Sequence, residues 1–78
     1  MPLVNKIKIY RAIHDLTQEQ LADRIGVTRK TINTIERGHF VPSTILALKI
    51  SRVFCVPVEE VFMLDDQEKL FLDQKGNQ

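Results

Sequence analysis

The stretch TQEQLADRIGVTRKTINTIERG, residues 17–38, sets the architecture of this chain. Thr17 and Gln20 have the spacing of a capping box, in which both side chains satisfy backbone amides at the start of a helix. Apolar residues then recur at helical spacing as far as Gly26, which can end a helix in the left-handed conformation. Thr28 has a side chain that can cap the next helix. The stretch therefore predicts two short helices joined by a tight turn.

The second predicted helix has two different faces. Ile32 and Ile35 lie on one side at helical spacing, and we expect them to face the core. The opposite side is basic and rich in hydrogen-bonding groups, and its residues are Arg29, Lys30, Thr31, Asn33, Thr34 and Arg37. This second face is suited to the major groove of DNA, because the groove admits a helix and presents both phosphates and base edges. The alternative is a charged face that is merely solvated.

Several positions of this stretch match one known pattern. The matching residues are Thr17-Gln18, Leu21-Ala22, Gly26-Val27-Thr28, Thr31-Ile32, Ile35-Glu36 and Gly38. On these residues the chain resembles the helix-turn-helix of phage repressors and Cro proteins, often called the Xre family, over about residues 5–62. The resemblance implies an all-α fold: a compact five-helix, phage-repressor-like DNA-binding domain with a short C-terminal extension.

The rest of the chain predicts three more helices, at about residues 5–14, 43–54 and 58–63. Asn5 and Ser43 are candidate N-caps for the first two of these helices. Residues 1–4 precede the first helix, and we expect them to form a mobile end or a short arm. We therefore divide the chain into a helix-turn-helix DNA-binding domain at residues 1–64 and an acidic, apolar tail at residues 65–78.

Length and composition exclude several classes of protein. The 78 residues allow one domain with a small core, and a hydrophobic fraction of 44% is ordinary for a globular fold. Cys55 is the one cysteine of the chain, so neither an internal disulfide nor a cysteine-based metal cluster can form. No apolar run approaches a membrane span, and the start MPLVNKIK is too polar for a signal peptide. We therefore expect a cytoplasmic protein without membrane association.

The charges are unevenly distributed along the chain. The formal net charge is only +1, but nine basic residues oppose four acidic residues up to Phe54. Beyond Phe54, two basic residues oppose six acidic residues. A basic body of charge +5 followed by an acidic end of charge −4 is expected to bind a polyanion at one side only.

The resemblance also implies which residues contact DNA. We expect base edges to be contacted by Arg29, Lys30, Thr31 and Thr34. The candidate phosphate contacts are Gln18, Thr28, Asn33, Arg37, His39 and Ser43. Arginine and lysine favour guanine, which presents two acceptors in the major groove, and the threonine methyl groups could touch thymine methyl groups.

Arg11 has a structural role in the resemblance. An arginine at this position pairs with the glutamate at the end of the recognition helix, which is Glu36 here. Such a pair would fix the recognition helix against the first helix. The alternative is a solvated arginine on the surface.

Some apolar residues lie outside the predicted core. These candidates for dimerisation or packing are Ile9, Ile13, Ile45, Met63, Leu70, Phe71 and Leu72. The Leu70–Leu72 cluster could form a short strand or a turn of helix, and periodicity does not decide between them. Our hypothesis is that these surfaces cover each other, either within one chain or across a homodimer.

Two positions depart from the family pattern. Cys55 stands where the family usually has glycine after the fourth helix, so a left-handed cap there would be strained. Pro57 replaces the usual serine or threonine cap of the next helix, and proline can start a helix without capping it.

The predicted function is that of a sequence-specific regulator of transcription that binds double-stranded DNA. The resemblance implies a repressor that reads an inverted-repeat operator as a homodimer. The sequence has no catalytic constellation, no glycine-rich phosphate loop and no metal-ligand spacing, so we expect neither an enzyme nor a bound cofactor or metal. The alternative is an antitoxin-like interaction module that neutralises a protein partner through its tail and regulates its own promoter. A weaker alternative is non-specific binding of nucleic acid, which the modest net charge disfavours.

Overall fold

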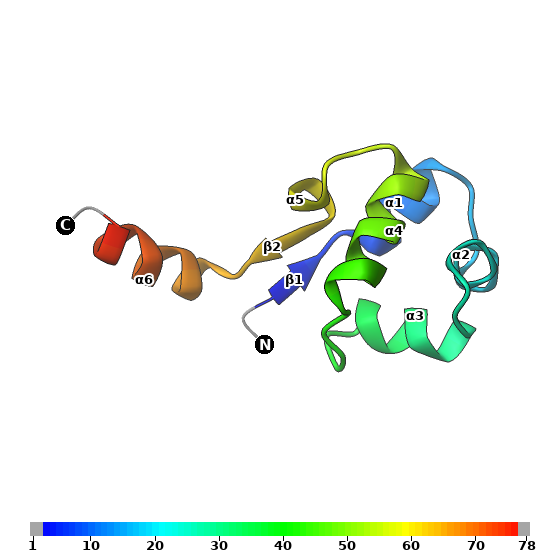
Figure 1. Cartoon of the computed structure of the whole chain (residues 1–78), viewed down its shortest axis with the longest axis horizontal. Helices are drawn as coiled ribbons and strands as arrows, with labels where there is room; N and C mark the ends of the chain where they lie inside the picture. The colour runs from blue at the N-terminus through cyan, green and yellow to red at the C-terminus, as the bar shows by residue number, and fades with distance from the viewer. Residues whose placement is uncertain (1–2, 77–78) are drawn as a thin grey trace.

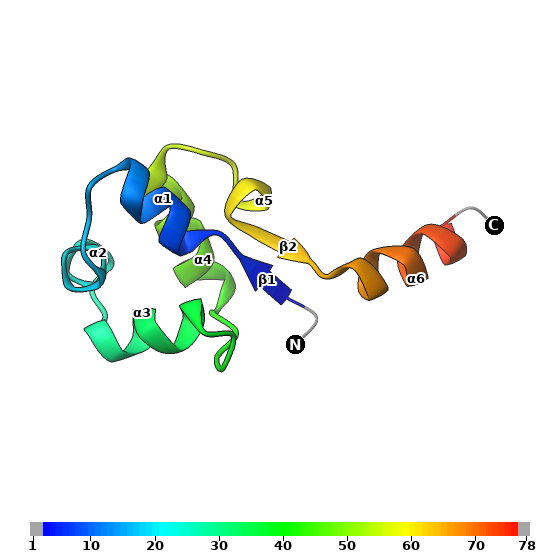
Figure 2. The same cartoon turned by 180° about the vertical axis from the view of Figure 1, so that it is seen from behind.

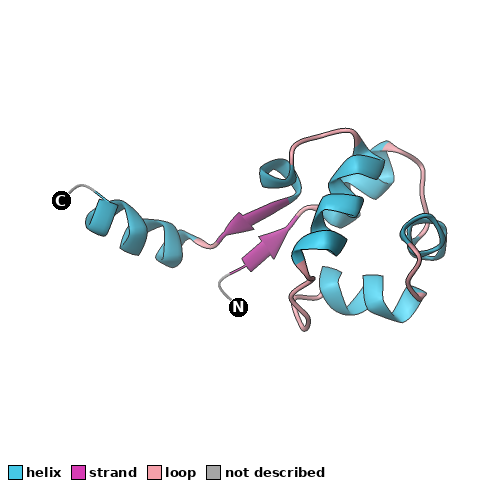
Figure 3. Ribbon diagram, in the orientation of Figure 1, coloured by secondary structure: helices cyan, strands magenta, loops and turns pink. Residues whose placement is uncertain are grey.

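A computed structural model of the chain describes residues 3–76 (Figure 1). Within these residues the elements follow in the order β1 (Leu3–Asn5), α1 (Ile7–Ile13), α2 (Gln18–Ile25), α3 (Arg29–Glu36), α4 (Thr44–Phe54), α5 (Val58–Val61), β2 (Phe62–Leu64) and α6 (Asp66–Gly76). The predicted helical class is confirmed. The small sheet of β1 and β2 is an addition that the sequence patterns did not indicate (Figure 3).

Helices α1 to α5 enclose one hydrophobic core. Its buried residues are Ile7, Leu16, Leu21, Ala22, Ile25, Ile32, Ile35, Ile50, Phe54, Val61 and Phe62. Each helix of the central motif contributes apolar residues at helical spacing, so burial of one face holds both helices in place. None of the helices within residues 3–76 combines the length and the apolar character needed to span a bilayer.

The predicted helix ends of the central motif are confirmed. The Thr17 hydroxyl accepts a 3.0 Å hydrogen bond from the amide of Gln20, and the Gln20 side chain accepts a 2.9 Å bond from the amide of Thr17. Gly26 adopts a φ of 77°, which a glycine tolerates without the steric penalty of a Cβ atom. The hydroxyl of Thr28 accepts from the Thr31 amide at the start of α3.

The first residues of the chain differ from the prediction. Leu3 and Val4 belong to β1, which pairs antiparallel with β2 in the register Leu3↔Leu64 and Val4↔Met63. The prediction of an arm is therefore wrong for these two residues. They form a strand because Met63 and Leu64 supply a second strand whose apolar side chains lie opposite theirs. Met1 and Pro2, the other residues of the predicted arm, lie outside the described residues.

The end of the predicted fifth helix also differs from the prediction. Helix α5 ends at Val61 instead of near Met63, because the backbone turns extended at Phe62 to enter β2. The carbonyl of Val61 accepts a 2.8 Å hydrogen bond from the amide of Lys6, which joins the end of α5 to the start of α1. The sheet thus closes one side of the helical body.

Helix α6 points away from the body formed by the other helices (Figures 1 and 2). Asp65 caps it, since its side chain accepts a 2.9 Å hydrogen bond from the amide of Glu68. The molecule is consequently elongated, with extents of 44 × 23 × 21 Å. Of the two conformations left open for the Leu70–Leu72 cluster, the structure has the helix.

Cys55 adopts the left-handed conformation in place of glycine, with a φ of 58° and a ψ of 38°. Its amide donates to the carbonyl of Arg52, and the next amide, that of Val56, donates to Ser51. These two bonds satisfy carbonyls at the end of α4. Helix α4 therefore ends in the left-handed cap that the sequence placed in doubt. The conformation is strained, because Cys55 has a Cβ atom that glycine lacks.

Candidate nucleic-acid interface

Helix α3 is fixed to the body by its apolar face. Ile32 and Ile35 are almost completely buried, and both belong to the continuous core. Ala22 on α2 is also buried, and its small side chain lets α2 and α3 pack closely. The opposite face of α3 is consequently presented to solvent in one fixed orientation.

The residues predicted to read bases lie on that outward face but differ in what they offer. Arg29 and Lys30 are exposed in the first turn of α3. The Thr34 hydroxyl lies 3.0 Å from the carbonyl oxygen of Lys30 and 2.9 Å from that of Thr31, and it donates to these oxygens of its own helix. The Thr31 hydroxyl lies 3.1 Å from that of Thr28. The long cationic side chains are therefore the main donors available to a ligand, while Thr34 offers its methyl group and acceptor lone pairs.

The residues predicted to contact phosphate are distributed around α3. Arg37 and His39 are exposed just beyond its end, and Asn33 lines a hollow together with Arg29 and Lys30. Thr28 and Ser43 each use the hydroxyl oxygen to accept from a backbone amide at a helix start. The Ser43 hydroxyl keeps its own hydrogen and can donate it to an anion, and Thr28 can do the same when Thr31 is the donor in the bond between the two threonine hydroxyls.

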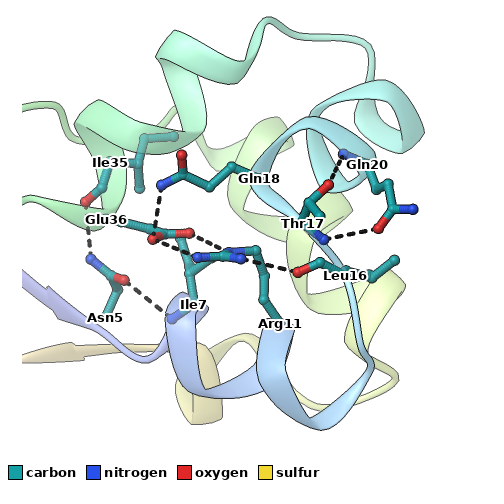
Figure 4. Close-up of polar contacts among 9 residues, drawn as sticks. All are labelled: Asn5, Ile7, Arg11, Leu16, Thr17, Gln18, Gln20, Ile35 and Glu36. Atoms are coloured by element: carbon teal, nitrogen blue, oxygen red, sulfur yellow. Dashed lines mark hydrogen bonds and ion pairs between the residues drawn. The ribbon is translucent and has the colours of Figure 1, made fainter.

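Gln18 has a partner within the protein. Its side-chain amide donates a 3.2 Å hydrogen bond to one carboxylate oxygen of Glu36, which lies at the end of α3 (Figure 4). Gln18 is half-buried, so this bond sets the orientation of the side chain at the start of α2. The residues are eighteen positions apart, and the contact was not predicted from the sequence.

Arg11 and Glu36 form a two-point ion pair (Figure 4). The Arg11 Nε and Nη2 atoms donate to the two carboxylate oxygens of Glu36 at 2.6 and 3.1 Å. The remaining Arg11 Nη1 atom donates to the carbonyl of Leu16 at 3.0 Å. The exposed fractions of the two side chains are only 15% and 8%, so solvent screens this pair weakly. Arg11 thereby joins α1 to the end of α3 and to the connection that precedes α2.

Asn5 has a role that sequence reasoning missed. It lies one residue before Lys6, which is the N-cap residue of α1, and its Oδ1 atom accepts from the amide of Ile7 at 3.2 Å. Its Nδ2 atom donates to the carbonyl of Ile35 at 3.0 Å (Figure 4). No local signal could have revealed this second bond, because the two residues are thirty positions apart.

Most of the candidate dimerisation residues remain exposed in the single chain. Ile9, Ile13 and Ile45 are each more than half exposed. The Leu70–Leu72 cluster is also exposed, since α6 points away from the body. Met63 is half-buried in β2. Folding of the single chain therefore leaves most of these apolar surfaces in contact with water.

Among the described residues, no three His, Cys, Asp or Glu side chains gather closely enough to hold a metal ion. His14 instead lies against a core ring, with its centroid 5.5 Å from that of Phe54. The features of this site are thus the basic face of α3 and the polar contacts that fix it.

Comparison with known proteins agrees with this architecture. The helix-turn-helix family model matches residues 7–61. The uncharacterised HTH-type transcriptional regulator MJ0272 of Methanocaldococcus jannaschii is 52% identical over 64 residues, which cover 82% of this chain and 97% of that protein. The uncharacterised HTH-type transcriptional regulator YgzD of Bacillus subtilis is 46% identical over 63 residues, covering 81% of this chain and 96% of the relative.

Solved structures share the fold. The restriction-modification controller protein C.AhdI from Aeromonas hydrophila has a TM-score of 0.65 and 28% identity, over 69% of this chain and 82% of that one. The hypothetical transcription factor NHTF from Neisseria has a TM-score of 0.68 and 24% identity, over 85% of this chain and 73% of that one.

The fold and the basic face of α3 define a helix-turn-helix protein of the DNA-binding class. The chain belongs to the helix-turn-helix family, and the predicted resemblance to its Xre type is confirmed. Helix α6 lies beyond residues 7–61, the part of the chain that the family model matches.

Proposed function

We propose that this protein recognises a specific sequence in double-stranded DNA and represses transcription there as a homodimer. The observation that carries the proposal is the placement of Arg29 and Lys30. Both are exposed in the first turn of α3, while the buried isoleucines of the same helix hold it rigidly to the core. A rigid helix with outward cations is what docking into a major groove requires.

Base recognition in this proposal falls to the first turns of α3. Arg29 or Lys30 donates to the N7 and O6 atoms of guanine. The pair of acceptors distinguishes guanine from the other bases in the major groove. Thr34 contributes its methyl group, because its hydroxyl donates to carbonyls of α3. The expected preference is therefore for guanine near the start of α3 and for thymine further along it.

Phosphate contacts orient the helix in the groove without reading sequence. The proposed contacts come from Gln18, Thr28, Asn33, Arg37, His39 and Ser43. The bond to Glu36 uses one of the two hydrogens of the Gln18 side-chain amide, and the other remains to donate to a phosphate beside the backbone amides at the start of α2. Phosphate binding by this group supplies affinity that falls as salt concentration rises.

Two copies related by a two-fold axis would place their α3 helices in successive major grooves, about 34 Å apart. The exposed apolar residues outside the core support association, because an apolar partner that covers them removes them from water. An occupied operator would then exclude RNA polymerase, and the proposed place of action is the cytoplasm.

The test is selection of binding sites from a randomised pool of DNA with the full-length protein. Enrichment of an inverted repeat with half-site centres about 10 base pairs apart would support a dimeric operator reader. Enrichment of a single half-site would contradict the dimer. No enrichment above a salt-sensitive background would contradict sequence-specific binding by the protein alone and would direct the search to a protein partner of the tail.

A further inference from the structure

An open apolar groove of about 1330 Å³ lies on the side of the body formed by α2, α4 and α5. Among its lining residues are Ile45 and Leu48 on α4 and Val56, Pro57 and Val58 around the start of α5. Ile45 and Leu48 are 69% and 52% exposed, so their side chains remain largely in water. Covering such a surface with an apolar partner lowers the free energy, because apolar groups leave water.

The groove has a basic border. Arg24 at the end of α2 and Lys49 and Arg52 on α4 line it, and Glu59 is the acidic residue among the lining residues. All three cationic residues are exposed. The chemistry that complements this groove is therefore an apolar segment that carries acidic groups.

Helix α6 of this chain has that chemistry. Leu70 and Leu72 are 62% and 50% exposed, and the acidic residues Asp66, Glu68 and Asp73 lie on the same helix. At about 100° per residue, Leu70–Leu72 spans an arc of about 200° around the helix axis. A flat surface cannot contact so wide an arc, but the two walls of a groove can.

The groove of the same chain is not the natural place for α6. A single residue, Asp65, links β2 to α6, and the Asp65 side chain caps the start of the helix. The helix points away from α2 and α4 in both views (Figures 1 and 2). The link of one residue leaves little chain for α6 to fold back over its own body, whereas a second molecule can be reached with α6 as it stands.

We propose that α6 of one molecule docks in the groove between α2, α4 and α5 of a second molecule, and that the exchange is reciprocal. The proposal rests on the homodimer of the proposed function and names the segment that forms it. It also explains why α6 lies outside the part of the chain that the helix-turn-helix family model matches: α6 is the dimerisation element that this chain adds.

Cys55 provides a direct test, because it is exposed and lines the groove. Gln67→Cys places a second thiol within the apolar arc of α6, and Lys69→Cys places one on the opposite side of the same helix. Each full-length variant is treated with a short bifunctional maleimide and separated by denaturing electrophoresis. We expect Gln67→Cys to give a covalent dimer in several-fold greater yield than Lys69→Cys.

The control is the Cys55→Ser, Gln67→Cys variant, in which the covalent dimer should disappear. A dimer that persists in this control would show that α6 contacts α6 instead of the groove, and it would overturn the proposal. A cross-link within one chain, seen as a modified monomer, would overturn it in favour of the chain's own groove. Equal yields from Gln67→Cys and Lys69→Cys would also contradict it.

A mixing experiment tests whether α6 of one molecule and the groove of another are the two surfaces that meet. Leu48→Glu places a charge in the groove, and Leu70→Glu places one on α6; both residues are exposed, so the body should fold with an unchanged circular dichroism spectrum. We expect each variant alone to sediment as a monomer. Their mixture should form a heterodimer, because one intact α6 then meets one intact groove. The Leu48→Glu, Leu70→Glu double variant should not associate with itself, and a mixture that stays monomeric would overturn the proposal.

These outcomes can be separated from those of the DNA selection. Enrichment of an inverted repeat without the Cys55 cross-link would leave the operator reader standing and remove α6 as its dimerisation element. A cross-linked dimer that enriches no sequence would keep α6 as the dimerisation element and contradict sequence-specific DNA binding.

Discussion

The side-chain amide of Asn5 donates a 3.0 Å hydrogen bond to the carbonyl oxygen of Ile35, and so joins the end of β1 to the last turn of α3. The same carbonyl accepts from the amide of Gly38. Carbonyls in the last turn of a helix lack partners within the helix, so both bonds satisfy a group that would otherwise need water. Helix α3 is therefore tied to the sheet as well as to the core.

Asn5→Ala should destabilise the fold by about 1–3 kcal/mol, because it removes the bonds to Ile35 and to the Ile7 amide. Urea unfolding followed by circular dichroism measures the change. Asn5→Asp is the matched control: it keeps the acceptor for Ile7 but turns a carboxylate toward the carbonyl of Ile35, and should also destabilise. An Asn5→Asp variant as stable as the parent would show that the bond to Ile35 contributes nothing.

Arg11→Ala should destabilise the fold by about 3 kcal/mol, because it leaves the largely buried carboxylate of Glu36 without its cationic partner. The Arg11→Met, Glu36→Met double variant should lose less than the sum of the two single methionine variants, since neither partner is then left alone. A double-mutant cycle of urea unfolding free energies measures the coupling. Additive single losses would contradict a direct interaction.

Arg29→Ala and Lys30→Ala should relax base preference at defined positions of the selected site, by about 1–3 kcal/mol for a residue that reads a guanine. Binding to matched and singly altered DNA duplexes measures the loss. Lys69→Ala on α6 removes a charge far from α3 and should leave base preference unchanged. Uniform weakening on all duplexes by Arg29→Ala and Lys30→Ala would assign both residues to phosphate.

Arg37→Ala should weaken binding to every duplex by a similar factor, because a phosphate contact carries no sequence information. The dependence of log K on log salt should become shallower by about one. Titrations at four or more salt concentrations measure that slope. A slope equal to that of the parent protein would place Arg37 outside the interface.

Cys55→Gly should stabilise the protein by about 1 kcal/mol, because glycine adopts the left-handed φ of 58° without the clash of a Cβ atom. The melting temperature should rise accordingly. Cys55→Ala keeps the Cβ and serves as the control, with no comparable gain expected. A higher melting temperature for Cys55→Ala than for Cys55→Gly would refute strain as the cause.

The sequence alone determined the helix-turn-helix and its ends. The capping box of Thr17 and Gln20, the turn at Gly26 and the cap at Thr28 each join residues only a few positions apart. Their hydrogen bonds depend on local spacing, and periodic apolar residues such as Ile32 and Ile35 mark the face that must be buried. Local patterns of this kind need no knowledge of the rest of the fold.

The Arg11–Glu36 pair was expected from the resemblance, but only the tertiary structure decided the other polar contacts that fix α3. The bond from Asn5 to Ile35 spans thirty positions, and that from Gln18 to Glu36 spans eighteen. The pairing of Leu3 with Leu64 brings the two ends of the body together. The direction of α6 likewise follows from the sheet that precedes it, because one residue separates β2 from α6. Residues far apart in sequence meet only when packing of the core places their backbones side by side, and spacing along the chain does not encode that placement.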